Sequence, residues 1–473
     1  MKKHLILAAA AALCLALGAK AEDNGQIVKT GYSYGPLPAL SFDSDKGFQY
    51  GALLQLYNYG DGSSYPMYKS KWYFEISAFT KGSQMYTIMY DKIELFPGVR
   101  FCATAKYMKD SAYDFYGFNG YNANVDRSGA FYWPTGIIAH PSLVTQGFSS
   151  EKLPYFSPFY KLKRNMFFTR ADFIGEITPN LHWMAGYHLH FFKQGTVDFD
   201  NLNKGKKESD MYYYSKTLLD YYTDWGIIPE DEKNGGVYSC LRAGIEYDTR
   251  DKEGAPTRGI WADAHVNIAP KWLGSSSDSY RYSLTWRQYF PLIGNDVLTF
   301  AYRLNWEGTF GDKVPYYILP YLTVVGSDND VDGMGGSKTC RGIVRGRVLG
   351  LDTGLYTAEL RWRFFQKQMF NQNIALGLNL FSDGAMAFRG VNTDYNPINA
   401  EGVASKPLYD LLVLNKKDTP HISVGAGFRF IMNENFIIAL DYGMPVSKFY
   451  SDDNPLKGQD GNGGMYIGLG YLF

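Results

Sequence analysis

The sequence predicts an all-β protein, a single transmembrane antiparallel β-barrel of about sixteen strands with long extracellular loops. Three observations support this prediction. Aromatic residues make up 17% of the chain and there are 50 glycines, an enrichment typical of strands and tight turns. Many segments alternate apolar and polar residues with a period of two, which is the period of a strand with two different faces. An export signal precedes these segments.

Charge and hydropathy exclude several other classes of protein. The 473 residues include 47 Lys and Arg and 47 Asp and Glu, so the formal net charge is zero. A nucleic-acid binder would normally carry a basic excess. Repeated apolar runs of about 20 residues, which a bundle of membrane helices needs, are missing.

Residues 1–21 have the pattern of a secretory signal peptide. Lys2 and Lys3 give a basic start, residues 5–17 are apolar, and Ala19-Lys20-Ala21 is a small-x-small cleavage site,. The apolar run is too short for a membrane anchor. We expect cleavage after Ala21, a short periplasmic segment at 22–37, and an outer-membrane barrel at 38–473.

Sixteen segments have strand patterns. They are 38–44, 47–58, 70–80, 84–93, 98–110, 163–177, 180–193, 237–249, 259–269, 278–290, 296–308, 355–366, 373–388, 420–431, 435–445 and 464–473,. If the first strand starts in the periplasm, the five long connections all fall outside the cell. This asymmetry is expected of outer-membrane barrels.

The last strand ends on an aromatic residue. An apolar face contains Met465, Ile467, Leu469, Tyr471 and Phe473, and we expect this face to contact lipid. The ending resembles the C-terminal signal of bacterial outer-membrane barrels.

Three short stretches carry a family resemblance. Residues 335–343 (Gly-Gly-Ser-Lys-Thr-Cys-Arg-Gly-Ile) lie in the long loop before the twelfth strand, and 381–385 (Phe-Ser-Asp-Gly-Ala) lie in the thirteenth. The third stretch is a periplasmic turn. Its motif residues are Tyr247, Asp248, Arg250, Asp251 and Gly259. Together they resemble the BamA/TamA superfamily of outer-membrane assembly and translocation barrels (the bacterial surface antigen family).

The resemblance implies a loop folded into the lumen. Its motif residues are Cys340, Arg341, Gly342 and Ile343. The family's loop arginine pairs with acidic residues on the twelfth and thirteenth strands, which here correspond to Glu359 and Asp383. Strand parity directs both carboxylates inward, and a guanidinium between two carboxylates suits the geometry that arginine favours.

The sequence departs from the family at several points. Cys340 replaces a small apolar residue before the arginine, and the glycine of 383–385 comes one position early. Only about twenty residues separate Ala21 from the first expected strand, so a periplasmic POTRA module does not fit. We therefore expect a POTRA-less branch of the family.

Other kinds of site are weaker. His188 and His190 share an inward face and could share a metal, but ordinary lumen-lining side chains explain them better. Residues 328–333 match the first half of a calcium loop, whereas Thr339 stands where the bidentate glutamate belongs. Three cysteines, Cys102, Cys240 and Cys340, follow the signal. An odd number leaves at least one unpaired, and no disulfide framework can be read from the sequence.

Two functions remain open from the sequence. The first is a biogenesis barrel that inserts, assembles or translocates proteins through a seam between its first and last strands. The alternative is a non-catalytic pore, receptor or structural subunit. Neither is an enzyme, and catalytic motifs, cofactors, resident metals, nucleic acid and small-molecule substrates are not expected. The expected partners are outer-membrane lipids and, for the first function, client barrels or accessory lipoproteins.

Overall fold

The computed structural model describes residues 30–473 except 44–46, 65–66, 126–156, 208–210, 212–215, 295, 323–330, 370–371, 433–435, 470 and 472. The expected signal peptide, and residues 22–29 of the segment after it, lie outside the described residues. Side chains at 37, 43, 157, 322, 331–332, 372–373, 436 and 469 are also outside the description.

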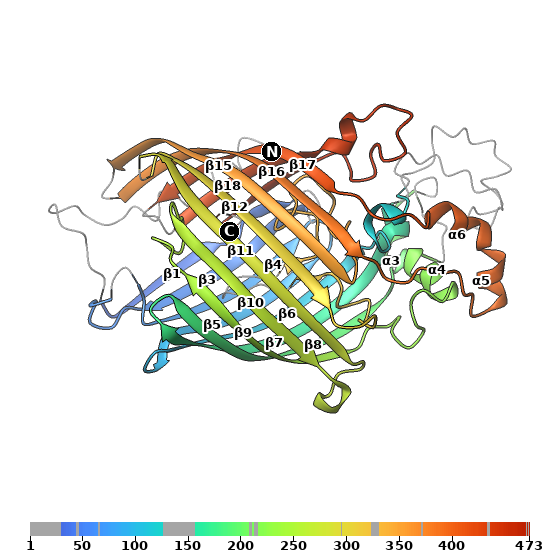
Figure 1. Ribbon diagram of the computed structural model, residues 1–473, viewed down its shortest axis with the longest axis horizontal. Helices are drawn as coiled ribbons and strands as arrows, with labels where there is room; N and C mark the ends of the chain where they lie inside the picture. The colour runs from blue at the N-terminus through green and yellow to red at the C-terminus, as the bar shows by residue number, and fades with distance from the viewer. Residues whose placement is uncertain are drawn as a thin grey trace.

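The structure is a closed antiparallel barrel (Figure 1). Its first half consists of β1 (Tyr32–Pro38), β2 (Ser41–Asp43), β3 (Gly47–Asn58), β4 (Ser70–Phe79), β5 (Gln84–Phe96), β6 (Val99–Asp114), β7 (Lys161–Thr178), β8 (Leu181–Thr196) and β9 (Val237–Asp248). The second half consists of β10 (Gly259–Ala269), β11 (Ser279–Ile293), β12 (Leu298–Thr309), β15 (Asp352–Met369), β16 (Gln372–Arg389), β17 (His421–Met432), β18 (Phe436–Pro445) and β19 (Gly464–Leu469).

These seventeen strands occupy sixteen positions, as predicted, because β1 and β2 are two pieces of one strand. Both pieces pair with β3 in the same register, with Pro38 opposite Ala52 and Ser41 opposite Gln49. The first strand therefore begins at Tyr32, whereas the sequence pattern placed its start at residue 38. The sequence pattern missed residues 32–37 of this strand because they include Pro36 and are followed by Pro38. Proline argues against a strand unless that strand lies at the edge of a sheet.

The long connections gather at one end of the barrel. They span 115–160, 197–236, 310–351, 390–420 and 446–463, and they include α3 (Phe199–Asn203), α4 (Leu218–Asp224), α5 (Ala400–Ala404), α6 (Lys406–Leu412) and the small hairpin of β13 (Tyr321–Leu322) with β14 (Val331–Asp332). Figure 1 shows the helices beyond this extracellular end, and short turns join the strands at the other end. None of the helices in the described residues is long and apolar enough to cross a membrane.

Side chains alternate between the two faces of the wall. On β11, Arg281, Ser283 and Arg287 are buried on the lumen side, whereas Leu284 and Trp286 are exposed on the outside. An apolar outer band and a polar interior are the features of a barrel whose outer solvent is lipid.

The extracellular loops pack into a cap with its own aromatic core. Phe115 contacts Tyr222 edge-on with ring centroids 5.6 Å apart, and Trp225 contacts Tyr409 in the same way at 5.4 Å. Trp225 is fully buried and donates a hydrogen bond to the Ser405 hydroxyl. Loops that are far apart in the sequence thus share one hydrophobic cluster above the lumen,.

Candidate functional site: the lumen loop and the seam

The loop before β15 folds against the inner wall through a compact turn. The Gly336 amide donates to the Ile343 carbonyl at 2.8 Å. Gly342 has a φ of +94°, and a Cβ there would lie 2.4 Å from the Gly443 carbonyl carbon on β18. Only glycine allows the loop backbone to approach the wall this closely.

Arg341 lies between the two predicted carboxylates. Its guanidinium forms a 2.7 Å ion pair with Glu359 on β15, and its Nε and Nη2 donate to the two Asp383 carboxylate oxygens on β16 at 2.9 and 3.0 Å. The Arg341 amide donates to Asp383 as well, at 3.0 Å. The same guanidinium lies 3.5 Å from the centre of the Phe381 ring, within cation–π range,. All three charged side chains are buried.

A third carboxylate, which the sequence reasoning missed, completes this cluster. Asp441 on β18 lies 3.3 Å from Arg341 and also accepts hydrogen bonds from Arg429 at 2.7 and 3.0 Å. Its parity was a readable signal, because it alternates with the exposed Leu440 and Tyr442 and must face the lumen,. The loop arginine therefore spans three strands, β15, β16 and β18.

The other motif residues pack on apolar wall positions. Cys340 and Ile343 are fully buried in a cluster with Leu355, Ala385 and Ala387. Cys340 is a free thiol, as are the buried Cys102 and Cys240. The Gly342 amide donates to the Tyr466 hydroxyl on β19 at 3.1 Å, so the loop also contacts the last strand.

The periplasmic turn between β9 and β10 is held by its own acidic residues. Asp248 binds the Arg250 guanidinium at 2.6 Å, and Asp251 accepts from the Thr257 amide and hydroxyl at 2.9 and 2.6 Å. Burial tends to raise the pKa of the Asp251 carboxyl, but these hydrogen bonds lower it below its ordinary value,. Gly259 closes the turn with a φ of +106°.

Tyr247 and Arg250 of the turn motif lie on opposite faces of the wall. Tyr247 lies on the outer face and is 40% exposed. The Arg250 guanidinium lies 3.9 Å from the centre of the Trp261 ring, and the Arg287 guanidinium lies at the same distance from that ring.

The seam between the first and last strands is short. Only two register pairs join β19 to β2 among the described residues, Tyr466 with Asp43 and Ile467 with Phe42. The neighbouring pairs of strands are joined over longer stretches, for example ten pairs between β17 and β18. On the seam side β1 has no partner strand in the described part of the chain, and its Tyr32 and Tyr34 side chains are 81% and 74% exposed.

The expectation that Tyr471 and Phe473 face lipid is wrong. Met465 is exposed on the outer face, but the strand ends at Leu469 and the later rings lie inside the barrel. The Arg361 guanidinium, which is buried on the lumen side of β15, lies 4.3 Å from the Tyr471 ring and 4.8 Å from the Phe473 ring. Ile467 stays in the wall opposite Phe42, and the Leu469 side chain lies outside the described residues.

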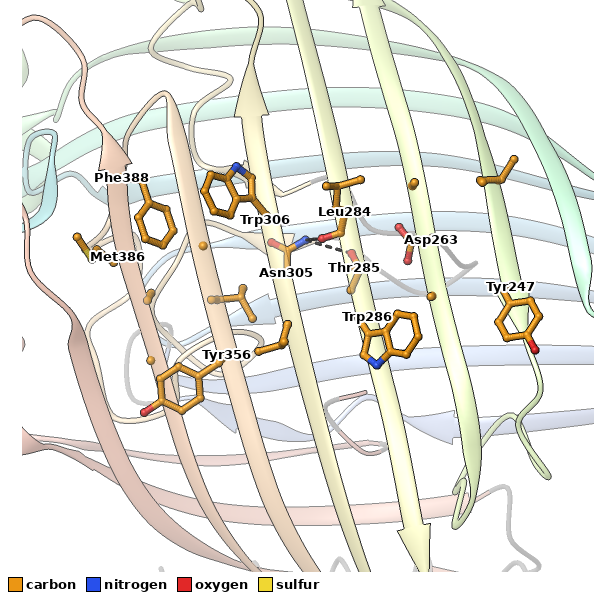
Figure 2. Close-up of a pocket in the computed structure, with 18 of the residues that line it drawn as sticks. Tyr247, Asp263, Leu284, Thr285, Trp286, Asn305, Trp306, Tyr356, Met386 and Phe388 are labelled. Carbon is orange, nitrogen blue, oxygen red and sulfur yellow. Dashed lines mark hydrogen bonds between the residues drawn. The ribbon is translucent and has the colours of Figure 1, made fainter.

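The outer wall has a broad apolar hollow of about 710 Å³ over β8 to β12, β15 and β16. Figure 2 shows Trp286, Trp306, Tyr356 and Phe388 standing on neighbouring strands along it. Trp306 and Phe388 stack with centroids 4.7 Å apart. These side chains face the lipid side of the wall, so the hollow offers a surface for hydrocarbon.

The weaker sequence candidates are separated by the structure. The His188 imidazole donates a hydrogen bond to the Asp172 carboxylate at 2.8 Å, whereas the His190 ring stacks with the Phe168 ring and with the Phe192 ring. Among the described residues no group of three or more His, Cys, Asp or Glu side chains is placed to hold a metal. Part of the calcium-like segment 328–333 lies outside the described residues.

Comparisons with known proteins agree with this geometry. The Omp85 superfamily domain matches residues 192–473. The fold is similar to BamA from Haemophilus ducreyi lacking POTRA domains 1–3, with a TM-score of 0.53, 14% identity, and coverage of 93% of this chain and 70% of that one. It is also similar to CdiB from Escherichia coli, with a TM-score of 0.50, 9% identity, and coverage of 94% of this chain and 64% of that one. A search of curated proteins found no matching sequence.

Proposed function

Since the chain belongs to the Omp85 superfamily, we propose that this outer-membrane barrel assists the insertion, assembly or translocation of proteins through the seam between β1/β2 and β19. The single observation that carries the proposal is the two-pair closure of the barrel. In this proposal the clients are strands of other outer-membrane proteins, the surrounding partner is lipid, and the chemistry is non-covalent. Accessory lipoproteins belong to the proposal as further partners.

Backbone chemistry supports an open edge at β1. Ala39 donates to the Gly51 carbonyl on β3 at 3.0 Å, so odd-numbered residues of the first strand direct their backbone groups to β3,. Even-numbered residues therefore direct theirs to the seam. In lipid, an unsatisfied backbone group costs several kcal/mol, and an added strand would satisfy these groups by β-augmentation.

A disulfide across the seam tests this mechanism. We would introduce Phe42→Cys with Ile467→Cys, which are register partners, and compare them with Val424→Cys and Met444→Cys, which are partners in the firmly paired β17 and β18. The readout is folding of a urea-unfolded eight-stranded barrel added to liposomes that contain the protein, followed by heat-modifiability on gels. The seam disulfide should stop assembly and reductant should restore it, whereas the control disulfide should leave assembly intact. Full activity of the oxidised seam variant would contradict the proposal.

Depletion in the host gives an independent test. Quantitative proteomics of the outer membrane should show loss of a defined set of barrels or surface lipoproteins. An unchanged outer membrane would favour the alternative, a pore, receptor or structural subunit. The capped extracellular end and the lumen loop argue against a wide pore, so planar-bilayer recordings should lack large steady openings.

The export signal is part of the same proposal. Cleavage after Ala21 would leave 22–31 ahead of β1 in the periplasm. N-terminal sequencing of protein purified from outer membranes tests this, since a retained residue 1 would contradict it.

A further inference from the structure

Three neighbouring strands present a cationic and aromatic surface to Tyr471 and Phe473. The surface consists of Tyr289 on β11, Arg303 on β12 and Arg361 on β15, which we name the lumenal basin. Their side chains are 2%, 6% and 5% exposed, so the basin is shielded from bulk water. β11 pairs with β12 and β12 pairs with β15, so one continuous piece of wall carries all three.

The basin contacts the backbone of Phe473 and the rings of both Tyr471 and Phe473, which follow the last strand. Arg361 Nη2 donates to the Phe473 backbone oxygen at 2.9 Å. The Phe473 ring lies 5.3 Å from the Arg303 guanidinium and 6.1 Å from the Tyr289 ring, and the Tyr471 ring lies 4.3 Å from Arg361. Guanidinium–ring contacts of this kind are stronger when they are desolvated.

The basin has donor capacity beyond these contacts. The Tyr289 hydroxyl, Arg303 Nε and Arg361 Nη1 are buried, and none has a hydrogen-bond partner in the described part of the chain. Arg361 Nε is paired with the Glu359 carboxylate at 2.7 Å, whereas Arg303 forms no ion pair with a carboxylate in the same part of the chain. Donors in excess of acceptors suit a ligand that is rich in carbonyl oxygens, and an extended peptide backbone is such a ligand.

Pairing with β1 in the wall would give Tyr471 and Phe473 fewer hydrogen bonds than a regular strand pair. Extending the register of Ile467 with Phe42 would put Tyr471 opposite Pro38 and Phe473 opposite Pro36. Both prolines stand at positions whose backbone faces the seam, and proline has no N–H to donate. If Tyr471 and Phe473 paired with β1, two of the backbone hydrogen bonds between the strands could not form. This loss favours the position of both residues in the basin.

We propose that the lumenal basin is a binding site for the end of an extended peptide strand with aromatic side chains two residues apart, and that residues 471–473 are its resident ligand. An incoming strand of an outer-membrane protein with the same spacing competes with that ligand. The identity of this incoming strand as a client rests on the proposed function. The basin itself lies in the lumen, distinct from the edge of β1.

The test uses the full chain in lipid nanodiscs and a fluorescein-labelled peptide with the sequence of residues 464–473. Binding is measured by fluorescence anisotropy. Deleting residues 471–473 should raise peptide affinity at least about tenfold, because the deletion removes a competitor held at high effective concentration. Adding Arg361→Gln to the deletion should reverse most of that gain, whereas Arg170→Gln, an inward arginine on β7, should not. A peptide with alanine at both aromatic positions should bind at least about tenfold more weakly.

Photo-crosslinking keeps the proposal testable if the deletion variant does not fold. The peptide then carries benzoylphenylalanine at the position of Phe473 and is added in excess to the unaltered chain. Crosslinks to β11, β12 or β15 support the basin. Crosslinks confined to Tyr32–Pro38, or equal affinity with and without Arg361, would overturn it while leaving the seam proposal standing. Peptide binding in the basin without client assembly in liposomes would support the basin and contradict the seam proposal.

Discussion

The Arg341 guanidinium lies 2.7 Å from the Glu359 carboxylate, and both side chains are shut off from solvent inside the barrel. One residue belongs to a loop that starts outside the cell, and the other belongs to a strand in the middle of the wall. The contact therefore fixes how far the loop enters the lumen. Desolvation makes such a pair sensitive to the loss of either partner.

Arg341→Ala should destabilise the barrel by about 3–5 kcal/mol, because three carboxylates would lose their shared cation in a buried setting. We expect a lower heat-unfolding temperature in detergent. Arg258→Ala serves as the control, since Arg258 is exposed in the periplasmic turn. Equal unfolding temperatures for Arg341→Ala and the unaltered protein would remove the structural role of this arginine.

Replacing Pro36 and Pro38 with valine should close the seam. The two new backbone N–H groups would face β19 and could donate hydrogen bonds to the carbonyl oxygens of Tyr471 and Phe473, which would then leave the basin. Hydrogen–deuterium exchange should show slower exchange in β1 and the end of β19, and client assembly should fall. Ser33→Val is the matched control, because its amide already faces β3. Unchanged exchange in the double variant would show that the prolines do not hold the seam open.

The extracellular cap should loosen in acid through Asp460. Burial tends to raise the pKa of this carboxyl, but the nearby His421, whose Nδ1 lies 2.5 Å away, and Arg347 lower it to about 2. The folded-state pKa thus lies below the unfolded value of about 3.9. The stabilisation is fully present above about pH 4 and is lost as the pH falls towards 2.

Asp460→Asn should therefore reduce the heat-unfolding temperature at pH 6 and have a smaller effect near pH 2. Asp394→Asn, at an exposed position of another loop, is the control. An effect of Asp460→Asn that stays constant over this range would show that the carboxylate charge does not stabilise the cap.

Leu284→Arg tests which face of β11 contacts lipid. Leu284 is half exposed and lines the outer hollow. A charge near the middle of the bilayer on this face costs about 2–4 kcal/mol. The arginine variant in lipid vesicles should therefore unfold at a lower urea concentration than the unaltered protein. Leu284→Met keeps an apolar side chain and should fold like the unaltered protein. Equal stability of the arginine and methionine variants would place this position away from hydrocarbon.

The alternation of residues was enough to predict most of the wall. Segments such as 47–58 and 259–269 coincide with β3 and β10, because a strand between lipid and a polar lumen must change character at every residue. The same parity directed Glu359 and Asp383 inward. The resemblance of 335–343 to a family motif then indicated which loop arginine they meet.

The sequence by itself determined the barrel, its strand count and the inward faces, since these follow from a local period of two. Tertiary structure alone decided that Asp441 joins Arg341, that β1 begins at Tyr32, and that Tyr471 and Phe473 turn into the lumen. These features depend on which residues of distant strands become neighbours when the sheet closes. Only in the closed barrel do the residues after β19 lie near both the prolines of the first strand and the arginines of β12 and β15. No local sequence pattern therefore shows whether those residues pair with the first strand or enter the lumen.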